Sequence, residues 1–238
     1  MEYLTKIDDV KKEKLNFQFT HIFRCLLVGP SGTGKSETLK EILKEHQNFF
    51  DIKFQFICYF YPSNGMSPIR KKYLKELIDI IPKLEVYEGI PKCVDVLPHK
   101  GSKLFIFEDL YYQALNDFDF MEFCIQGSHQ SNTSFFMTCQ NLYQNSRYKS
   151  SIIRQMTDFI IWPYIGDHTT LAYLSSQIHG DRGFLPSCMK WLKSNVSNPY
   201  ERCIWVSLNI SDKTPEKYRT RSNFVKKNPV IIFQSKNN

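Results

Sequence analysis

The sequence predicts an α/β fold in which a mainly parallel central sheet is flanked by helices on both faces. Apolar runs of strand length alternate with segments of helical periodicity. Runs such as "FQFICYF" and "KLFIFED" are almost continuously apolar, which is typical of strands buried on two sides. A glycine-rich turn joins the first expected strand, 21–29, to the first expected helix, 34–46. Together these observations favour βαβ crossovers and a layered α/β domain.

The expected elements follow one another along the chain. Strands are expected at 21–29, 54–62, 102–110, 134–142, 158–164 and 202–210. Helices are expected at 34–46, 68–83, 119–129, 150–158, 168–178 and 184–194. The apolar "VIIF" at 230–233 is expected to add an edge strand or to pack on a neighbouring subunit.

Length and composition indicate one folded domain. The chain has 238 residues and 42% hydrophobic content, which is enough to bury a substantial core. We expect an N-terminal extension over 1–15 and a single domain over 16–238. No apolar run is long enough to span a bilayer, and the N-terminus is charged. We therefore expect a soluble, intracellular protein with no membrane partner.

Cysteine usage and net charge add weaker constraints. The seven cysteines are scattered without a CxxC pair, so we interpret them as reduced packing residues. A formal net charge of +7, with 31 lysines and arginines, permits a polyanionic partner such as nucleic acid. Many basic proteins bind no nucleic acid, so charge alone does not decide the partner.

The segment 26–36, "LLVGPSGTGKS", carries the strongest signal in the chain. Its pattern is G-x-x-x-x-G-K-[ST], and it lies between an expected strand and an expected helix. Glycines let successive backbone amides converge on one point, and the helix N-terminus adds its positive dipole end. Phosphate is the natural occupant, and the alternative is a glycine-rich turn with an exposed lysine. The expected nucleotide-binding residues are Gly29, Pro30, Ser31, Gly32, Thr33, Gly34, Lys35, Ser36 and Glu37.

Two roles within this loop follow from the chemistry of the side chains. Lys35 is expected to reach the β and γ phosphates of ATP as a point charge, and Ser36 to take one position on Mg²⁺. The apolar run 104–107 ends in Glu108 and Asp109, which would emerge at the same edge of the sheet. We assign Glu108 to the Mg²⁺ shell, through water, and Asp109 to orienting the attacking water. The two roles could be exchanged, and a capped strand end is the alternative.

The next expected strand ends in Gln140 and Asn141. A neutral amide beside the nucleotide could hydrogen-bond the γ phosphate or the attacking water and so report hydrolysis. We predict this role for Gln140. A turn-forming Gln-Asn pair explains the same two letters equally well.

The phosphate loop, "FIFEDL" and "SFFMTCQNLY", in this order and spacing, resemble the FtsK/HerA-type ATPases. Among these are the genome-packaging ATPases of double-stranded DNA viruses and virus-like transposons. Segments 147–180 and 202–224, the latter with Arg219 and Arg221, resemble the later part of the family pattern. Two departures stand out: Glu108 occupies a place more often held by Asp, and residues 206–208 lack an acid that the family often carries.

The resemblance implies a P-loop NTPase fold of the ASCE/RecA-like type that uses ATP and Mg²⁺. It further implies a homo-oligomeric ring, a pentamer or hexamer, that threads double-stranded DNA into a capsid in the cytoplasm or nucleus of an infected cell. Ring ATPases can take an arginine finger from a neighbouring subunit. Arg147 is the first candidate for this finger and Arg154 the second, and each could equally be a solvated surface residue.

Residues that contact DNA are harder to identify, because surface lysines and arginines are common. The candidates for contact with DNA phosphates are Lys149, Arg182, Lys190, Lys226 and Lys227. Each could instead be an ordinary solvated charge.

Three other functions stay open. The loop "GPSGTGKS" also resembles that of nucleotide kinases such as guanylate kinase, although neither an arginine-rich lid nor an acceptor site is identifiable. A nucleotide-gated assembly factor would bind ATP without turnover. A DNA-translocating ATPase of recombination or conjugation would share the motor but serve another process.

Overall fold

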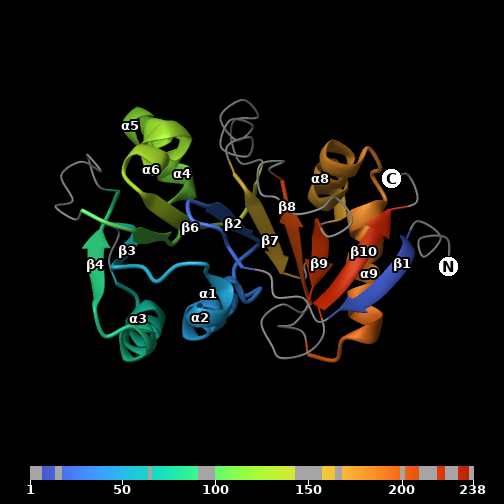
Figure 1. The fold of residues 1–238 in the computed structure, drawn as a ribbon, viewed down its shortest axis with the longest axis horizontal. Helices are drawn as coiled ribbons and strands as arrows, with labels where there is room; N and C mark the ends of the chain where they lie inside the picture. The colour runs from blue at the N-terminus through green and yellow to red at the C-terminus, as the bar shows by residue number, and fades with distance from the viewer. Residues whose placement is uncertain are drawn as a thin grey trace.

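The fold was analysed in a computed structural model, which describes residues 7–13, 18–63, 66–90, 100–142, 157–163, 168–198, 202–208, 219–222 and 230–235. These residues form a ten-stranded sheet with the strand order β1-β10-β9-β8-β7-β2-β6-β5-β3-β4. Helices cover the sheet on both sides (Figure 1). The predicted α/β fold class is confirmed.

The bounds of most elements agree with the sequence pattern. The strands are β1 (Ile7–Glu13), β2 (Arg24–Val28), β3 (Phe56–Tyr61), β4 (Leu84–Glu88), β5 (Lys103–Phe107), β6 (Thr133–Cys139), β7 (Phe159–Pro163), β8 (Cys203–Ser207), β9 (Thr220–Ser222) and β10 (Val230–Ser235). The helices are α1 (Lys35–Lys44), α2 (His46–Phe49), α3 (Pro68–Ile80), α4 (Tyr111–Ala114), α5 (Phe118–Glu122), the π-helix η3 (Phe123–Gly127), α6 (Ser128–Gln130), α8 (His168–His179) and α9 (Phe184–Asn195).

The sheet has a parallel part and an antiparallel part. Strands β7, β2, β6, β5, β3 and β4 are parallel to their neighbours in this order. Strand β8 then pairs antiparallel with β7, and β9, β10 and β1 continue antiparallel. The expectation that 230–233 forms an edge strand is wrong, because β10 lies between β9 and β1.

The segment expected as an N-terminal extension contributes the edge strand β1. Its sequence, "IDDVKKE", is mostly charged, so it carries no apolar run by which a strand could be recognised. Charged residues are common on edge strands, where they discourage pairing with other chains. Strands β4 and β9 were also not predicted; β9 spans only Thr220–Ser222, and no residue of β4 is fully buried. The helix expected at 150–158 falls mostly outside the described residues.

Two hydrophobic clusters fill the two sides of the sheet, because successive strand residues point to opposite faces. On β2, Leu26 and Val28 join one cluster, whereas Cys25 and Leu27 join the other. The first cluster also contains residues of α4, α5, α8 and α9, and the second contains residues of α1, α2 and α3. The cysteines within the described ranges are all buried, as expected for packing residues. Among the helices that the structure describes, none has the length and hydropathy to cross a bilayer.

A half-buried histidine, His179, links the end of α8 to the antiparallel part of the sheet. The Nε2 atom of His179 lies 3.0 Å from Oγ1 of Thr220, and its ring packs edge-on against Phe184. Burial, together with the nearby Arg219 guanidinium, lowers the pKa of His179 to about 4, although Asp181 acts in the opposite direction. The folded state therefore binds fewer protons at this site than the unfolded chain.

Acidification should destabilise the fold through His179. The stabilising contribution of the neutral ring is fully present above pH 6.5, the ordinary pKa, and is lost as the pH falls toward 4, with a total of about 3 kcal/mol. A His179→Gln variant should lose this part of the pH dependence, as measured by urea unfolding at pH 7 and pH 4.5. An unchanged pH dependence in the variant would contradict the assignment.

Candidate functional site

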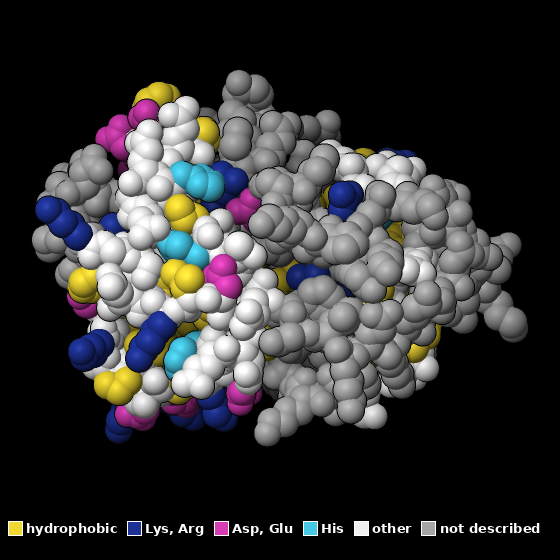
Figure 2. Space-filling view, viewed as in Figure 1, with side chains coloured by type: hydrophobic (Ala, Val, Ile, Leu, Met, Phe, Trp, Pro, Cys, Tyr) yellow, Lys and Arg dark blue, Asp and Glu magenta, His cyan; other side chains and the backbone are white. Residues whose placement is uncertain are grey.

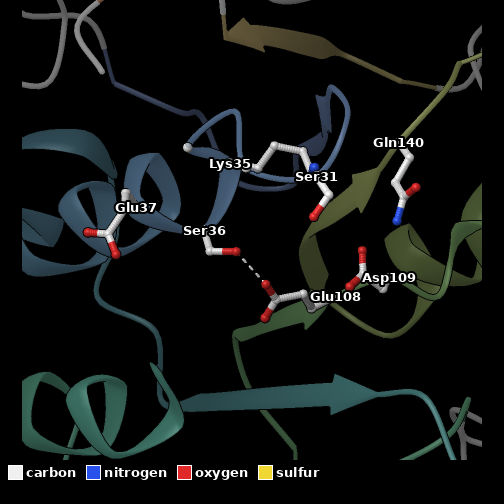
Figure 3. A pocket seen from close by; sticks show the side chains of 9 residues that line it. Ser31, Lys35, Ser36, Glu37, Glu108, Asp109 and Gln140 are labelled. Atoms are coloured by element: carbon white, nitrogen blue, oxygen red, sulfur yellow. Dashed lines mark hydrogen bonds between the residues drawn. The ribbon is translucent and has the colours of Figure 1, made fainter. Parts of the chain in front are cut away.

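The parallel register brings three strand ends together at one edge of the sheet. Val28 at the end of β2 is in register with Cys139 at the end of β6, and the amide of Gly29 donates to the carbonyl of Cys139 at 2.9 Å. Phe107 at the end of β5 is in register with Met137 of β6. The glycine-rich loop after β2, the acids after β5 and Gln140 after β6 therefore border the same cleft (Figure 3).

The glycine-rich loop has the backbone shape that its sequence predicts. Gly32 and Gly34 have φ values of 80° and 88°, a left-handed conformation that is accessible to glycine at little cost. Gly34 is also the N-cap of α1, and Thr33 Oγ1 donates to the Pro30 carbonyl at 2.8 Å. In the described part of the chain, no acceptor is bonded to the backbone amides of residues 32–36. These amides lie at the positive end of the helix dipole and are open to an anion.

Lys35 places a cation at the base of this loop. Its Nζ atom donates to the carbonyls of Gly29, at 2.5 Å, and Pro30, at 2.9 Å, and the residue is 8% exposed. Burial lowers the pKa of Lys35, while the negative charge of Asp109 is the largest influence in the opposite direction. The ammonium group is thus held by the loop itself, within the lining of the cleft.

Ser36 and Glu108 meet directly across the cleft. The hydroxyl of Ser36 donates to Oε1 of Glu108 at 2.5 Å (Figure 3). Burial raises the pKa of Glu108, and hydrogen bonds donated by Ser36 and by Tyr59 lower it. A hydroxyl and a carboxylate oxygen are the hard ligands that Mg²⁺ prefers, together with waters and phosphate oxygens. The donor set of these two residues fits that metal.

Asp109 forms hydrogen bonds with other residues than Glu108 does. Its backbone has a φ of 55°, its amide donates to Thr138 Oγ1 at 2.9 Å, and its Oδ2 atom accepts from Arg70 at 3.1 Å. The exposed Gln140 lies opposite Asp109 on the cleft (Figure 3). The two neighbouring acids are thus directed to different groups, which supports assigning them different roles.

The cleft itself has a volume of about 260 Å³, which is slightly less than a typical pocket for a whole small-molecule ligand and suits the phosphate end of a nucleotide. Its lining consists of Ser31, Gly32, Gly34, Lys35, Ser36, Glu37, Glu108, Asp109 and Gln140. The remaining expected binding residues, Gly29, Pro30 and Thr33, shape the loop through the hydrogen bonds given above.

Three further side chains contact the site residues and were not predicted from the sequence. Tyr59 on β3 donates to Glu108, Arg70 on α3 pairs with Asp109, and Tyr73 on α3 donates to the carbonyl of Ser36 at 3.0 Å. Ser67 and Pro68 mark the start of α3, with the Ser67 side chain accepting from the Arg70 amide. These two residues predict the start of the helix. Nothing in the sequence indicates that α3 packs beside the phosphate loop.

The structure describes only two of the residues predicted to act as arginine fingers or DNA contacts. The candidate fingers Arg147 and Arg154 and the candidate DNA contacts Lys149, Lys226 and Lys227 lie outside the described residues. Lys190 is exposed, and Arg182 stacks 5.0 Å over the ring of Tyr173.

The arginine pair near the C-terminus is partly placed. Arg221 is buried and stacks 4.6 Å over the ring of Trp205, so it belongs to the core of the antiparallel part. Arg219 is half-buried. Only Arg219 is thus partly open to solvent.

Comparison with known proteins gives matches among solved structures alone; no protein-family model and no curated protein matches the chain. The chain is similar to the genome packaging NTPase B204 from Sulfolobus turreted icosahedral virus 2 in complex with AMP, with 17% identity, a TM-score of 0.49, and coverage of 82% of this chain and 95% of that chain. It is also similar to the cytoplasmic domain of the Type VII secretion ATPase EccC from Thermomonospora curvata, with 11% identity, a TM-score of 0.46, and coverage of 89% and 25%.

B204 is a genome packaging NTPase, which is the class of protein that the sequence motifs resemble. At such low identities and TM-scores, these likenesses do not show what this chain does.

The backbone of Asp109 offers a test of the site geometry. Asparagine tolerates a positive φ, whereas a β-branched residue there is strongly disfavoured. We expect the free energy of unfolding of Asp109→Asn to lie within about 1 kcal/mol of the wild-type value. The free energy of unfolding of Asp109→Val should be lower by a further 1 to 3 kcal/mol, roughly. Urea unfolding at neutral pH measures both. Equal stability of the two variants would contradict the left-handed conformation at this position.

Proposed function

We propose that this chain is an ATPase whose cleft holds the triphosphate of Mg-ATP. The observation that carries the proposal is the convergence of the open loop amides, Lys35, Ser36 and Glu108 on one cleft. Amides and an ammonium group match a polyphosphate, and the Ser36 and Glu108 oxygens match its metal. The amides and the ammonium group alone would also fit a simple anion. The metal-binding oxygens beside them favour a nucleotide that carries a divalent cation.

The residues of the cleft would divide the chemistry among them. The loop amides and Lys35 bind the phosphates and offset charge that develops on their oxygens. Ser36 and, through water, Glu108 would hold Mg²⁺, whose positive charge would neutralise phosphate oxygens. Asp109 orients the attacking water, and the amide of Gln140 bonds the γ phosphate or that water.

We further propose that hydrolysis drives translocation of double-stranded DNA, with packaging of a viral genome into a capsid as its use. The order and spacing of the three motifs support this use, and the net charge of +7 is compatible with a DNA partner. Figure 2 shows lysines and arginines mixed with acids over α3 on the face in view, so the residues of this helix form no purely basic track. The DNA-contacting residues therefore remain those proposed from the sequence.

A ring of five or six subunits is part of the same proposal. Among the described residues, Arg70 is the arginine that contacts an acid of the cleft, and it is paired with Asp109. A finger supplied by a neighbour, Arg147 or Arg154, would complete the site, at a gain of roughly 10³ to 10⁵ in rate.

Lys35→Ala should reduce the rate of ATP hydrolysis by roughly 10² to 10³-fold or more. The substitution removes the positive charge that offsets the negative charge on the γ phosphate in the transition state. Lys44→Ala is the matched control, since Lys44 is an exposed lysine on the same helix. Steady-state phosphate release measures the rates, and circular dichroism checks the fold. Normal turnover in a folded Lys35→Ala protein would remove the proposed site.

The motor proposal predicts that specific ATPase activity rises with protein concentration and is stimulated by duplex DNA, because a finger in trans needs a neighbour. Phosphate release measured over a hundredfold dilution series, with and without duplex DNA, tests both. Full activity at high dilution without a DNA effect would contradict the motor. Phosphate transfer to a nucleoside monophosphate would indicate a kinase, and ATP binding without turnover would indicate an assembly factor.

A further inference from the structure

A buried tyrosine touches the cleft from the side of the core. Tyr59 lies on β3 and is 0% exposed. Strand β3 is parallel to β5, with Tyr59 in register with Ile106, and the amide of Glu108 donates to the carbonyl of Phe60 at 3.0 Å. This pairing places the phenol beneath the side chain of Glu108, and the Tyr59 hydroxyl donates to Oε2 of that carboxylate.

Glu108 is therefore held at both of its oxygens. Ser36 donates to Oε1 on the cleft side, and Tyr59 donates to Oε2 on the core side. A glutamate side chain has several rotatable bonds and adopts many orientations when only one oxygen is held. With Oε2 bonded to a rigid, buried phenol, the plane of the carboxylate is set and Oε1 faces Ser36 (Figure 3).

We propose that Tyr59 is a positioning residue that orients Glu108 toward the divalent cation of the bound nucleotide. The inference rests on the proposed function, because it names the group that acts through one of the two metal-holding residues. It concerns the hydroxyl and not the ring, since a phenylalanine would fill the same space. Within the described ranges, no other group donates to Oε2 of Glu108.

The chain offers a matched control for the loss of a phenol. Tyr87 on β4, which is half-buried, also donates its hydroxyl to a carboxylate, Oε2 of Glu85 at 2.5 Å, and its ring stacks on Phe60. Neither Tyr87 nor Glu85 lines the cleft. Removing the two hydroxyls separately thus compares the same chemical change inside and outside the site.

The test compares wild type, Tyr59→Phe and Tyr87→Phe in two binding measurements. In the first, Mn²⁺ is titrated into protein in excess over ADP, and free Mn²⁺ is read by electron paramagnetic resonance. In the second, the affinity for ADP is measured in EDTA. We expect Tyr59→Phe to weaken Mn²⁺ binding by about tenfold or more while its metal-free affinity for ADP stays within about twofold of the wild type. Tyr87→Phe should match the wild type in both.

A Tyr59→Phe protein that binds Mn²⁺ as tightly as the wild type would overturn the inference and leave the proposed function standing. A wild type that binds neither ADP nor Mn²⁺ would overturn the proposed function itself, and this inference with it. A general loss of affinity, in EDTA as well as with Mn²⁺, would indicate a merely structural role and would also overturn the inference.

Tyr59→Phe removes a donor from a buried carboxylate. If the variant does not fold for this reason, a second pair of variants provides the test. Glu108→Gln and Tyr59→Phe/Glu108→Gln carry no charge at that position. If Tyr59 acts through Glu108, these two proteins should have the same Mn²⁺ affinity. A further loss of about tenfold in the double variant would show that Tyr59 acts by another route and would overturn the inference.

Discussion

The cleft depends on the parallel register of β2, β6 and β5. In this register the three strands end at one level. The loop after β2, the amide after β6 and the acids after β5 therefore lie side by side. A shift of one residue between β5 and β6 would turn every side chain of β5 to the opposite face, and Glu108 would no longer face Ser36. All residues of β5 and β6 are buried, and their apolar side chains oppose such a shift, because the shift would exchange the contacts of these side chains between the two clusters.

Two charged residues of the cleft, Lys35 and Glu108, are buried more deeply than is usual for charged residues. Lys35 and Glu108 are each 8% exposed, and burying an ion is costly unless hydrogen bonds compensate it. Lys35 is compensated by two carbonyls of its own loop, and Glu108 by two hydroxyls. Every one of these partners is neutral. The loop and the acid are therefore stabilised separately, and within the described ranges neither Lys35 nor Glu108 forms an ion pair that would neutralise the site.

Helix α3 contacts the site and helix α1 through three residues on one of its faces. Arg70 pairs with Asp109, Tyr73 donates to the carbonyl of Ser36, and Glu76 bonds Lys40 of α1 at 2.7 Å. These residues are spaced by three, so they share one face of the helix. The packing of α3 thus supports the phosphate loop and one acid at the same time.

The sequence by itself determined the parts of this protein that local pattern encodes. The phosphate loop, the acids at 108–109 and most strands and helices could be recognised because glycine spacing and hydrophobic period depend on near neighbours in the chain. Tyr59, Arg70 and Tyr73 were not recognisable, since their partners are 49, 39 and 37 residues away. Likewise, the charged strand β1 joins the sheet by pairing with β10 at the other end of the chain. Only the tertiary structure decides such pairings, because a contact between distant residues leaves no periodic trace in either segment.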